Sequence, residues 1–354
     1  MKNPSPSPSS HPDPILGCLL GTAVGDAIGL PAEGLSRTKA GKFCEGGLRH
    51  RLWFGHGMFS DDTEHTLMVA AALHRHRKDV IAFQRSLAWP LRWWMLALPA
   101  GVGLSTAKAI LRLWIGFPVS RAGVRSAGNG AAMRSSIIGV AFSQDKEKRQ
   151  SFALAACRLT HTDQRAEESA LLVAEAAAMI TAEMDNKDLI AALSPLVKSS
   201  EMTLRWEKLL IGLHEGMGIQ AYADTIGCER GVSGFAPNTL AVALFVCMRH
   251  RGNFRRIITD VVACGGDTDT VAAIAGGICG AEVGEGGIPP EWVQGICDWP
   301  RSVGYIRKTA EALGNPAGEG TLPPLRWWAV PLRNLFFLLV VLGHGFRRLV
   351  PSFK

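Results

Sequence analysis

The chain has 354 residues, of which 47% are hydrophobic and 19% are charged, and its formal net charge is +7. This composition fits a globular protein with a large buried core. It excludes nucleic acid as a partner, because residues 321–354 hold five Lys and Arg and no acidic residue, which leaves the rest of the chain nearly balanced.

The sequence divides into three parts. The opening segment MKNPSPSPSSHPDP is rich in Pro and Ser and lacks the apolar stretch of a signal peptide, so residues 1–14 are predicted to be a disordered leader. Residues 15–313 form one domain in this interpretation, and residues 314–354 form a linker followed by a hydrophobic, basic tail. The eight cysteines include no CxxC pair, which indicates reduced thiols and a cytoplasmic protein.

Small and apolar residues recur at helical spacing through the whole domain, and alternating runs typical of strands are few. We therefore expect an all-α fold. The predicted helices cover residues 15–29, 63–77, 80–98, 104–115, 131–143, 147–159, 164–183, 188–198, 202–215, 237–249, 254–263, 270–281 and 290–297.

The first predicted helix, ILGCLLGTAVGDAIG, carries glycine at every fourth position, at Gly17, Gly21, Gly25 and Gly29. This spacing places neighbouring glycines on one helix face. Each glycine costs about 1 kcal/mol relative to alanine within a helix. The stripe is therefore expected to pack closely against another backbone in the core. A membrane-spanning pair is the alternative, but the run is short and Asp26 interrupts it.

Two later helices are each expected to begin with a pair of carboxylates beside a hydroxyl. A single carboxylate at such a position is explained by helix capping, whereas two pairs are explained poorly. If these two acidic helix starts, the acidic openings, face each other, their charges require neutralisation. Oxygen ligands suit Mg²⁺, Mn²⁺ or Ca²⁺. A site for two hard cations is one interpretation, and simple capping is the other. The residues concerned are Ser60, Asp61, Asp62, Asp267, Asp269 and Thr270.

Two glycine-rich stretches are candidate anion-binding loops, since glycine lets the backbone approach a phosphate. They contain Gly101, Gly103, Ser105 and Thr106 in the first and Gly128, Asn129 and Gly130 in the second. Each stretch alone is equally compatible with an ordinary turn. His161, between two predicted helices, is a candidate contact for a phosphate or ribose, although a lone histidine is more often structural. Asp26 and Glu33 follow the glycine stripe, and Glu33 is expected on a loop after Pro31.

The tail LRWWAVPLRNLFFLLVVLGHGFRRLVP has an apolar centre flanked by tryptophans and arginines, which suits a membrane interface. Its uninterrupted apolar centre is shorter than the roughly 18 residues expected of a spanning helix. An interfacial or re-entrant helix within residues 325–350, a helix docked on another subunit, a membrane span and a last core helix all remain open.

Together these segments resemble the ADP-ribosylglycohydrolase family. The matching stretches are GCLLGTAVGDAIGLPAE, FSDDT, GVGLST, GNGAAMR, THTD and CGGDTDTVAAIAGGICGA, in the family's order over residues 17–281. The resemblance implies an all-helical orthogonal fold and a site for two Mg²⁺ or Mn²⁺ ions. It implies that these ions are held by Ser60, Asp61, Asp62, Asp267, Asp269 and Thr270, with Asp269 between them.

The resemblance further implies that Glu33 is a mobile glutamate guarding the site and that Glu33 or Asp61 handles the proton in catalysis. Asp26, Gly101 to Thr106, Gly128 to Gly130 and His161 are then expected on the side of the site that binds ADP-ribose. The implied activity is hydrolysis of the C1″ bond between ADP-ribose and a protein side chain, with arginine as the first expectation. Serine-linked or free ADP-ribose derivatives, and a non-catalytic ADP-ribose sensor, are the alternatives. The tail leaves open a further one, a membrane-anchored regulatory or scaffold protein. The oligomeric state and the partner protein stay open.

Overall fold

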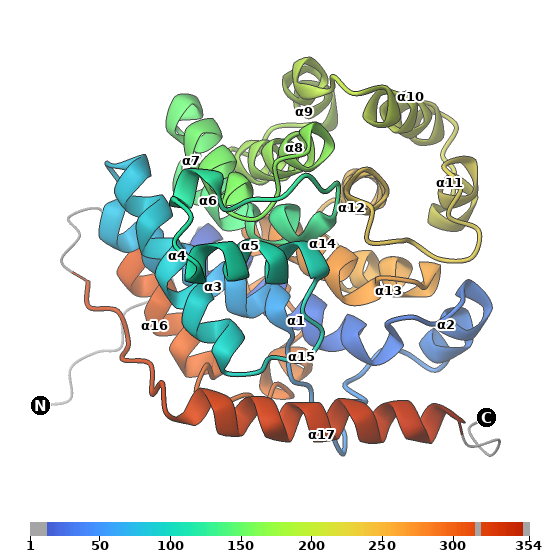
Figure 1. Ribbon diagram of the computed structural model, residues 1–354. Helices are drawn as coiled ribbons and strands as arrows, with labels where there is room; N and C mark the ends of the chain where they lie inside the picture. The colour runs from blue at the N-terminus through green and yellow to red at the C-terminus, as the bar shows by residue number, and fades with distance from the viewer. Residues whose placement is uncertain (1–12, 316–319, 350–354) are drawn as a thin grey trace, which may run out of the picture.

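The computed structural model describes residues 13–315 and 320–349. Within these ranges the chain forms seventeen α-helices and four short 3-10 helices and has no β-strand, so the predicted all-α class is confirmed (Figure 1). Of the predicted leader, residues 1–12 lie outside the described part, and the first helix begins directly after Asp13. The Asp13 carboxylate accepts hydrogen bonds from the backbone amides of Ile15 and Leu16 and caps this helix.

The α-helices of the described residues follow one another in chain order. The first half of the chain contains α1 (Pro14–Gly29), α2 (Arg37–Cys44), α3 (Asp61–His76), α4 (Val80–Leu96), α5 (Leu104–Trp114), α6 (Ser136–Ala141), α7 (Lys146–Arg158) and α8 (Gln164–Thr181). The second half contains α9 (Asn186–Leu193), α10 (Ser200–His214), α11 (Ile219–Thr225), α12 (Ala236–Arg249), α13 (Phe254–Cys264), α14 (Thr268–Gly287), α15 (Pro290–Gln294), α16 (Val303–Gly314) and α17 (Ala329–Leu349).

The glycine stripe of α1 packs directly against the backbone of α14, as the sequence predicts. A Cβ atom added to Gly21 would lie 2.1 Å from the carbonyl oxygen of Gly276, and one added to Gly17 would lie 2.0 Å from that of Gly280. No side chain fits between two backbones at this separation. The contacts run in opposite directions along the two helices, so α1 and α14 form an antiparallel pair at the centre of the molecule (Figure 1).

The register of the α1–α14 pair determines which residues meet at the end of α1. Gly29, the last residue of α1, sits against the first turn of α14, where a Cβ on Gly29 would lie 2.5 Å from the carbonyl oxygen of Thr268. The Thr268 hydroxyl donates a hydrogen bond of 2.9 Å to the carbonyl oxygen of Gly29. The close pairing therefore brings the segment that follows α1 to the acidic start of α14.

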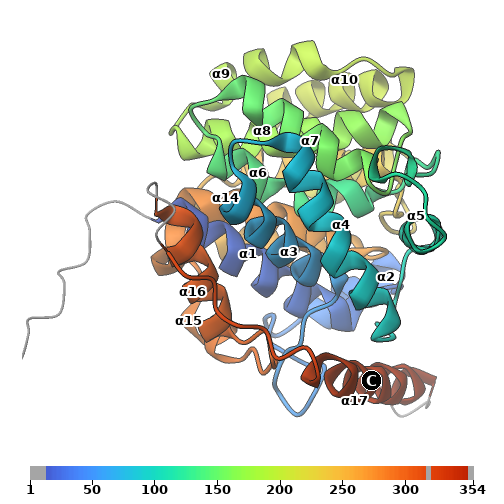
Figure 2. The same ribbon diagram turned by 60° about the vertical axis from the view of Figure 1, so that its left-hand side comes forward.

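The tail packs along the same domain through one face of α17. The buried Arg333 forms an ion pair with the buried Asp298, and Asn334 donates a hydrogen bond of 2.9 Å to the carbonyl oxygen of Ala97. Phe337 and Val340 join a small apolar cluster beneath the helix. The structure thus shows a helix docked on the surface of its own domain and not a buried core helix, across one edge of the molecule in both views (Figures 1 and 2).

Three helices of the domain were not expected from the sequence, namely α2, α11 and α16. The first two are only eight and seven residues long, and α2 has a single fully buried residue, Ala40. Periodicity is weak in such short elements, so their helical form depends on tertiary packing. The predicted element at 131–143 is divided into a 3-10 turn (Asn129–Arg134) and α6.

Candidate functional site

The first acidic opening, Ser60 to Asp62 at the start of α3, is held in place by Asp26 of α1. The buried Asp26 carboxylate accepts hydrogen bonds from the backbone amide of Ser60 at 2.9 and 3.0 Å, and from the amide and hydroxyl of Thr63 at 3.1 and 2.6 Å. A carboxylate from another helix thus satisfies amides at the start of α3 that have no partner within the helix. Asp26, expected on the substrate side, lies beneath Ser60 and positions this opening.

The position of the second acidic opening, Asp267 to Thr270 at the start of α14, depends on two glycines with positive φ. Gly265 and Gly266 have φ values of 71° and 83°, which residues with a side chain rarely adopt. A Cβ on Gly266 would lie 2.0 Å from the carbonyl oxygen of Val232. The turn allows the amide of Asp267 to donate to that same oxygen at 2.8 Å. Asp267 and the first turn of α14 are thereby oriented towards α3.

The two openings, about 200 residues apart in the sequence, meet at one place. The Thr270 hydroxyl of α14 donates a hydrogen bond of 3.1 Å to Asp62 Oδ2 of α3, and the Ser60 hydroxyl donates to the same oxygen at 3.1 Å. Burial raises the pKa of both Asp61 and Asp62, and the nearby negative charge of Asp267 adds to both shifts. The structure therefore brings together the six residues that the sequence singles out as cation ligands.

Because these carboxylates are buried and close to one another, their ionisation costs free energy. Burial raises the pKa of Asp61 to about 8, with further contributions from Asp26 and Glu64. Burial also raises the pKa of Asp62 and of Asp269 well above the ordinary range, and neighbouring carboxylates add to both shifts. For Asp26 burial outweighs the hydrogen bonds from Thr63 and Ser60 and raises the pKa to about 6. Such a cluster favours binding of a compensating positive charge.

Two buried carboxylate oxygens without a hydrogen-bond partner indicate whether the cluster fits a cation. Asp62 Oδ1 and Asp269 Oδ1 are buried, and within the described structure neither has a hydrogen-bond partner. Buried acceptors without a partner are rare and costly. Among the residues described, no group of three His, Cys, Asp or Glu side chains is arranged to hold an ion alone. A cation here would therefore also need the hydroxyls of Ser60 and Thr270 and water, a donor set that fits a hard ion.

Glu33 lies on the loop that links α1 to α2, beside the second opening. Gly34 donates a backbone hydrogen bond of 2.8 Å to Gly266, and Gly266 donates one of 2.9 Å to Leu35, so the loop is fixed to the GGDTDT turn. The Glu33 residue itself is exposed to solvent. Partial desolvation of the carboxyl beside the cluster and the charge of Asp267 raise its pKa, while Arg348 lowers it. The structure thus places Glu33 at the open side of the carboxylate cluster.

The second glycine-rich stretch borders the cluster on another side. The Asn129 side-chain amide donates hydrogen bonds of 2.6 Å to Asp267 Oδ2 and 3.0 Å to the Thr239 hydroxyl. The backbone amide of Asn129 donates to the carbonyl oxygen of Gly234 at 3.0 Å. The loop that contains Gly128 to Gly130 therefore lies next to the expected cation ligands.

The His161 ring packs against the loop that contains Gly128 to Gly130. Its ring is buried, with Nε2 3.3 Å from a Cβ placed on Gly128 and Cε1 3.2 Å from one on Gly130. Burial and the nearby charge of Arg134 lower the pKa of His161 to about 3, so the ring is neutral at physiological pH. Its contact with a ligand stays a prediction, because in this structure the ring touches the loop glycines.

The first glycine-rich stretch reaches the same loop through Thr106, whose hydroxyl lies 3.6 Å from a Cβ placed on Gly130. Gly101 is exposed and has a φ of 77°, and Gly103 immediately precedes α5. Ser105, in the first turn of α5, is half-buried. Thr106 is thus the residue of this stretch that the structure brings next to the second loop.

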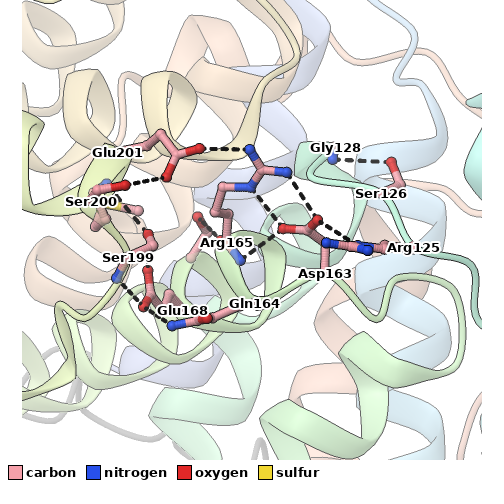
Figure 3. A network of polar contacts seen from close by, with 12 residues as sticks. Arg125, Ser126, Gly128, Asp163, Gln164, Arg165, Glu168, Ser199, Ser200 and Glu201 are labelled. Carbon is pink, nitrogen blue, oxygen red and sulfur yellow. Dashed lines mark hydrogen bonds and ion pairs between the residues drawn. The ribbon is translucent and has the colours of Figure 1, made fainter.

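A polar network lies at the start of α8, near Gly128 (Figure 3). Arg165 forms a two-point ion pair with Asp163, at 2.8 and 3.0 Å, and a third contact of 2.7 Å with Glu201. The Arg125 guanidinium lies 4.0 Å from Asp163, and its side chain is 90% exposed. These contacts fix the start of α8 directly after His161.

Contacts from the tail to the site were not foreseen. Arg333 donates a hydrogen bond to the carbonyl oxygen of Phe59, and Asp298 accepts one of 3.4 Å from the amide of Phe59, the residue before Ser60. Arg348 and His344 contact the carbonyl oxygen of Pro31 beside Glu33. Basic residues within an apolar helix were the available signal, because such residues need partners when they are buried.

Comparison with known proteins places this geometry in context. The model of the family described as ADP-ribosylglycohydrolase matches residues 7–320. A solved structure titled "ADP-ribosylglycohydrolase-related protein complex" superimposes with a TM-score of 0.65 at 27% sequence identity, over 85% of this chain and 96% of that one.

Curated relatives agree with this match. An uncharacterized protein of Archaeoglobus fulgidus is 28% identical over 79% of this chain and 90% of its own. The ADP-ribosylarginine hydrolase Tri1 of Pseudomonas putida (strain GB-1) is 27% identical, over 88% of this chain and 81% of its own. The ADP-ribosyl-[dinitrogen reductase] glycohydrolase of Rhodospirillum rubrum is 25% identical, over 81% and 90% respectively.

Proposed function

The chain belongs to the ADP-ribosylglycohydrolase family, and on this basis we propose that it removes ADP-ribose from a protein side chain by hydrolysing the bond at C1″ of the distal ribose. The observation that carries the proposal is the meeting of α3 and α14, where Asp62 and Asp269 each keep a buried oxygen without a hydrogen-bond partner in the described structure. Retention of all six expected ligands argues against a sensor that has lost catalysis.

In the proposed site Ser60, Asp61, Asp62, Asp267, Asp269 and Thr270 hold two divalent cations, Mg²⁺ or Mn²⁺. When bound, these ions would supply positive charge for the vicinal hydroxyls of the ribose and for a water molecule that becomes a nucleophile near neutral pH. Thr270 and Ser60 orient Asp62 through their hydrogen bonds, and Asn129 orients Asp267. Bound cations would satisfy the unpartnered oxygens of Asp62 and Asp269.

The protein's own groups complete the reaction. Cleavage at C1″ passes through a transition state like an oxocarbenium ion, and a carboxylate close to the attacking water removes its proton. As water bonds to C1″ the bond to the acceptor side chain breaks, and the released side-chain atom takes up a proton. Glu33, at the open side of the cluster, and Asp61, at the start of α3, are the two candidates for this role. The loops at Gly101–Thr106 and Gly128–Gly130 are the proposed contacts of the diphosphate, and the surrounding helices limit the orientations of the sugar.

Arginine is the proposed acceptor residue. The support comes from the Pseudomonas putida relative, whose name describes it as an ADP-ribosylarginine hydrolase. All eight cysteines are free thiols, which supports action in a reducing, cytoplasmic compartment.

The proposal is tested with purified protein and Mg²⁺ or Mn²⁺. Peptides that carry ADP-ribose on arginine, serine or cysteine are incubated separately, and release of free ADP-ribose is followed by chromatography. We expect release from the arginine linkage. Release from serine alone would retain the reaction class and change the acceptor. Binding of ADP-ribose without release from any peptide would show a sensor and refute the hydrolase.

A further inference from the structure

The helix α17 has an unusual distribution of polarity. Its polar residues Arg333, Asn334 and His344 face the protein, where each forms a hydrogen bond. The face turned to solvent is almost entirely apolar and exposes Leu332, Leu335, Phe336, Leu339, Leu342 and Phe346, each by 41–67%. A helix on the surface of a globular protein normally has the opposite arrangement, with its polar face outward.

The apolar face of α17 continues onto neighbouring elements. Trp53 contacts Phe336 with ring centroids 5.1 Å apart, and the adjacent Phe54 is 83% exposed. Trp299 contacts Trp328 at 5.7 Å just before the helix. A cavity of about 370 Å³ between α4 and the start of α17 is lined in part by Trp89 and Trp93. Exposed apolar surface of this extent marks an interaction site.

The charge of the segments that supply this surface has one sign. Residues 46–60, 80–117 and 321–349 contain ten Lys and Arg, of which Arg333 is neutralised by the buried Asp298, and none of the 31 Asp and Glu of the chain. The remainder, with 28 Lys and Arg against 31 Asp and Glu, is acidic. A second copy placed on this surface would bring like charges together. An anionic surface is the complementary partner.

We propose that this surface binds an anionic lipid bilayer, with α17 lying parallel to the membrane plane. Indole rings beside a basic, apolar helix are typical of proteins at the boundary between headgroups and acyl chains. The helix is long and apolar enough to span a bilayer, with a mean hydropathy of 1.6 over residues 329–348. The buried ion pair between Arg333 and Asp298 instead keeps it against the domain.

The experiment uses the full chain and a flotation assay with two kinds of vesicle. One is pure phosphatidylcholine, and the other contains about 30% phosphatidylglycerol to give a negative surface. We expect flotation with the anionic vesicles that weakens at high salt, and little flotation with the neutral ones. The double variant Leu335→Gln/Leu339→Gln should reduce the partition coefficient at least about tenfold, because it removes two leucines from the bilayer contact.

A matched control is available on the far side of the molecule. Leu204 and Ile211 of α10 are exposed by 49% and 52%, and α10 lies opposite α17 in both views (Figures 1 and 2). The double variant Leu204→Gln/Ile211→Gln should bind vesicles like the wild type. Absence of flotation, or equal loss in both variants, would overturn the proposal. So would self-association that Leu335→Gln/Leu339→Gln abolishes while vesicles do not bind. Neither outcome bears on hydrolysis, which both variants should retain in solution.

Discussion

The guanidinium of Arg348 donates a hydrogen bond of 2.9 Å to the carbonyl oxygen of Glu33, a residue 315 positions earlier in the chain. A second hydrogen bond from the same group reaches the carbonyl oxygen of Pro31, and His344 Nε2 lies 3.0 Å from that oxygen. The inner face of α17 thus holds the loop that carries the proposed catalytic glutamate, while its outer face meets solvent.

Removal of this contact should lower turnover as well as stability. In Arg348→Ala the loop loses hydrogen bonds from a charged donor, each of which is typically worth about 1.5–3 kcal/mol. We expect kcat on an ADP-ribosylated arginine peptide to fall about three- to tenfold, by loss of Glu33 positioning. Arg348→Lys should restore part of the activity. Unchanged kcat in Arg348→Ala would show that the loop does not depend on α17.

Replacement of Asp267 tests the carboxylate cluster. Asp267→Asn removes one of several mutually repelling charges, so the variant should fold at least as well as the wild type without added metal. Its hydrolysis should fall by at least about 100-fold, because it loses a charged ligand in the proposed site. Thermal unfolding with and without Mn²⁺ gives a second readout, since a ligand that binds the native state raises the melting temperature.

A control for this variant is Asp188→Asn, on the exposed first turn of α9. It should match the wild type both in activity and in the upward shift of the melting temperature with Mn²⁺. An Asp267→Asn protein that remains fully active and keeps the wild-type Mn²⁺ shift would remove Asp267 from the site.

The addition of one methyl group to α1 tests the close packing of α1 against α14. Gly21→Ala places a Cβ 2.1 Å from the Gly276 carbonyl oxygen, so α1 and α14 must separate, and we expect a loss of about 3 kcal/mol or more of folding stability. Gly41→Ala in α2 is the matched control, since no atom lies within 4 Å of its Cβ, and it should be neutral or stabilising by about 1 kcal/mol. Denaturant unfolding measures both, and equal effects would contradict the packing described.

The buried His161 predicts a dependence of stability on pH. Its pKa is about 3 in the folded protein and near 6.5 when exposed, so the unfolded chain takes up the proton first as the pH falls. Stability is therefore lost from about pH 6.5 downward. His161→Gln should reduce the loss of unfolding free energy between pH 7 and pH 5 by about 2 kcal/mol. If both proteins lose the same amount, His161 is accessible to protons in the folded state.

Much of the site was visible in the sequence because its residues lie at helix starts with unusual composition. Ser60, Asp61 and Asp62 on one helix, and Asp267, Asp269 and Thr270 on another, contain more carboxylates than capping requires. Asn129 was expected through its glycines, but its hydrogen bond to Asp267 was not. The support given by Asp26 and His161 was also hidden, because a partner more than thirty residues away leaves no local pattern.

The sequence by itself determined the helical class, the glycine stripe and the two acidic openings, since each of these depends on spacing within one segment. Only the tertiary structure decided that α1 and α14 pair in the register that brings Glu33 to Asp267, and that α17 covers its own domain. Those outcomes depend on contacts between segments hundreds of residues apart. An apolar helix with buried arginines is compatible with several surroundings, and the partners Asp298, Phe59 and Glu33 select one of them.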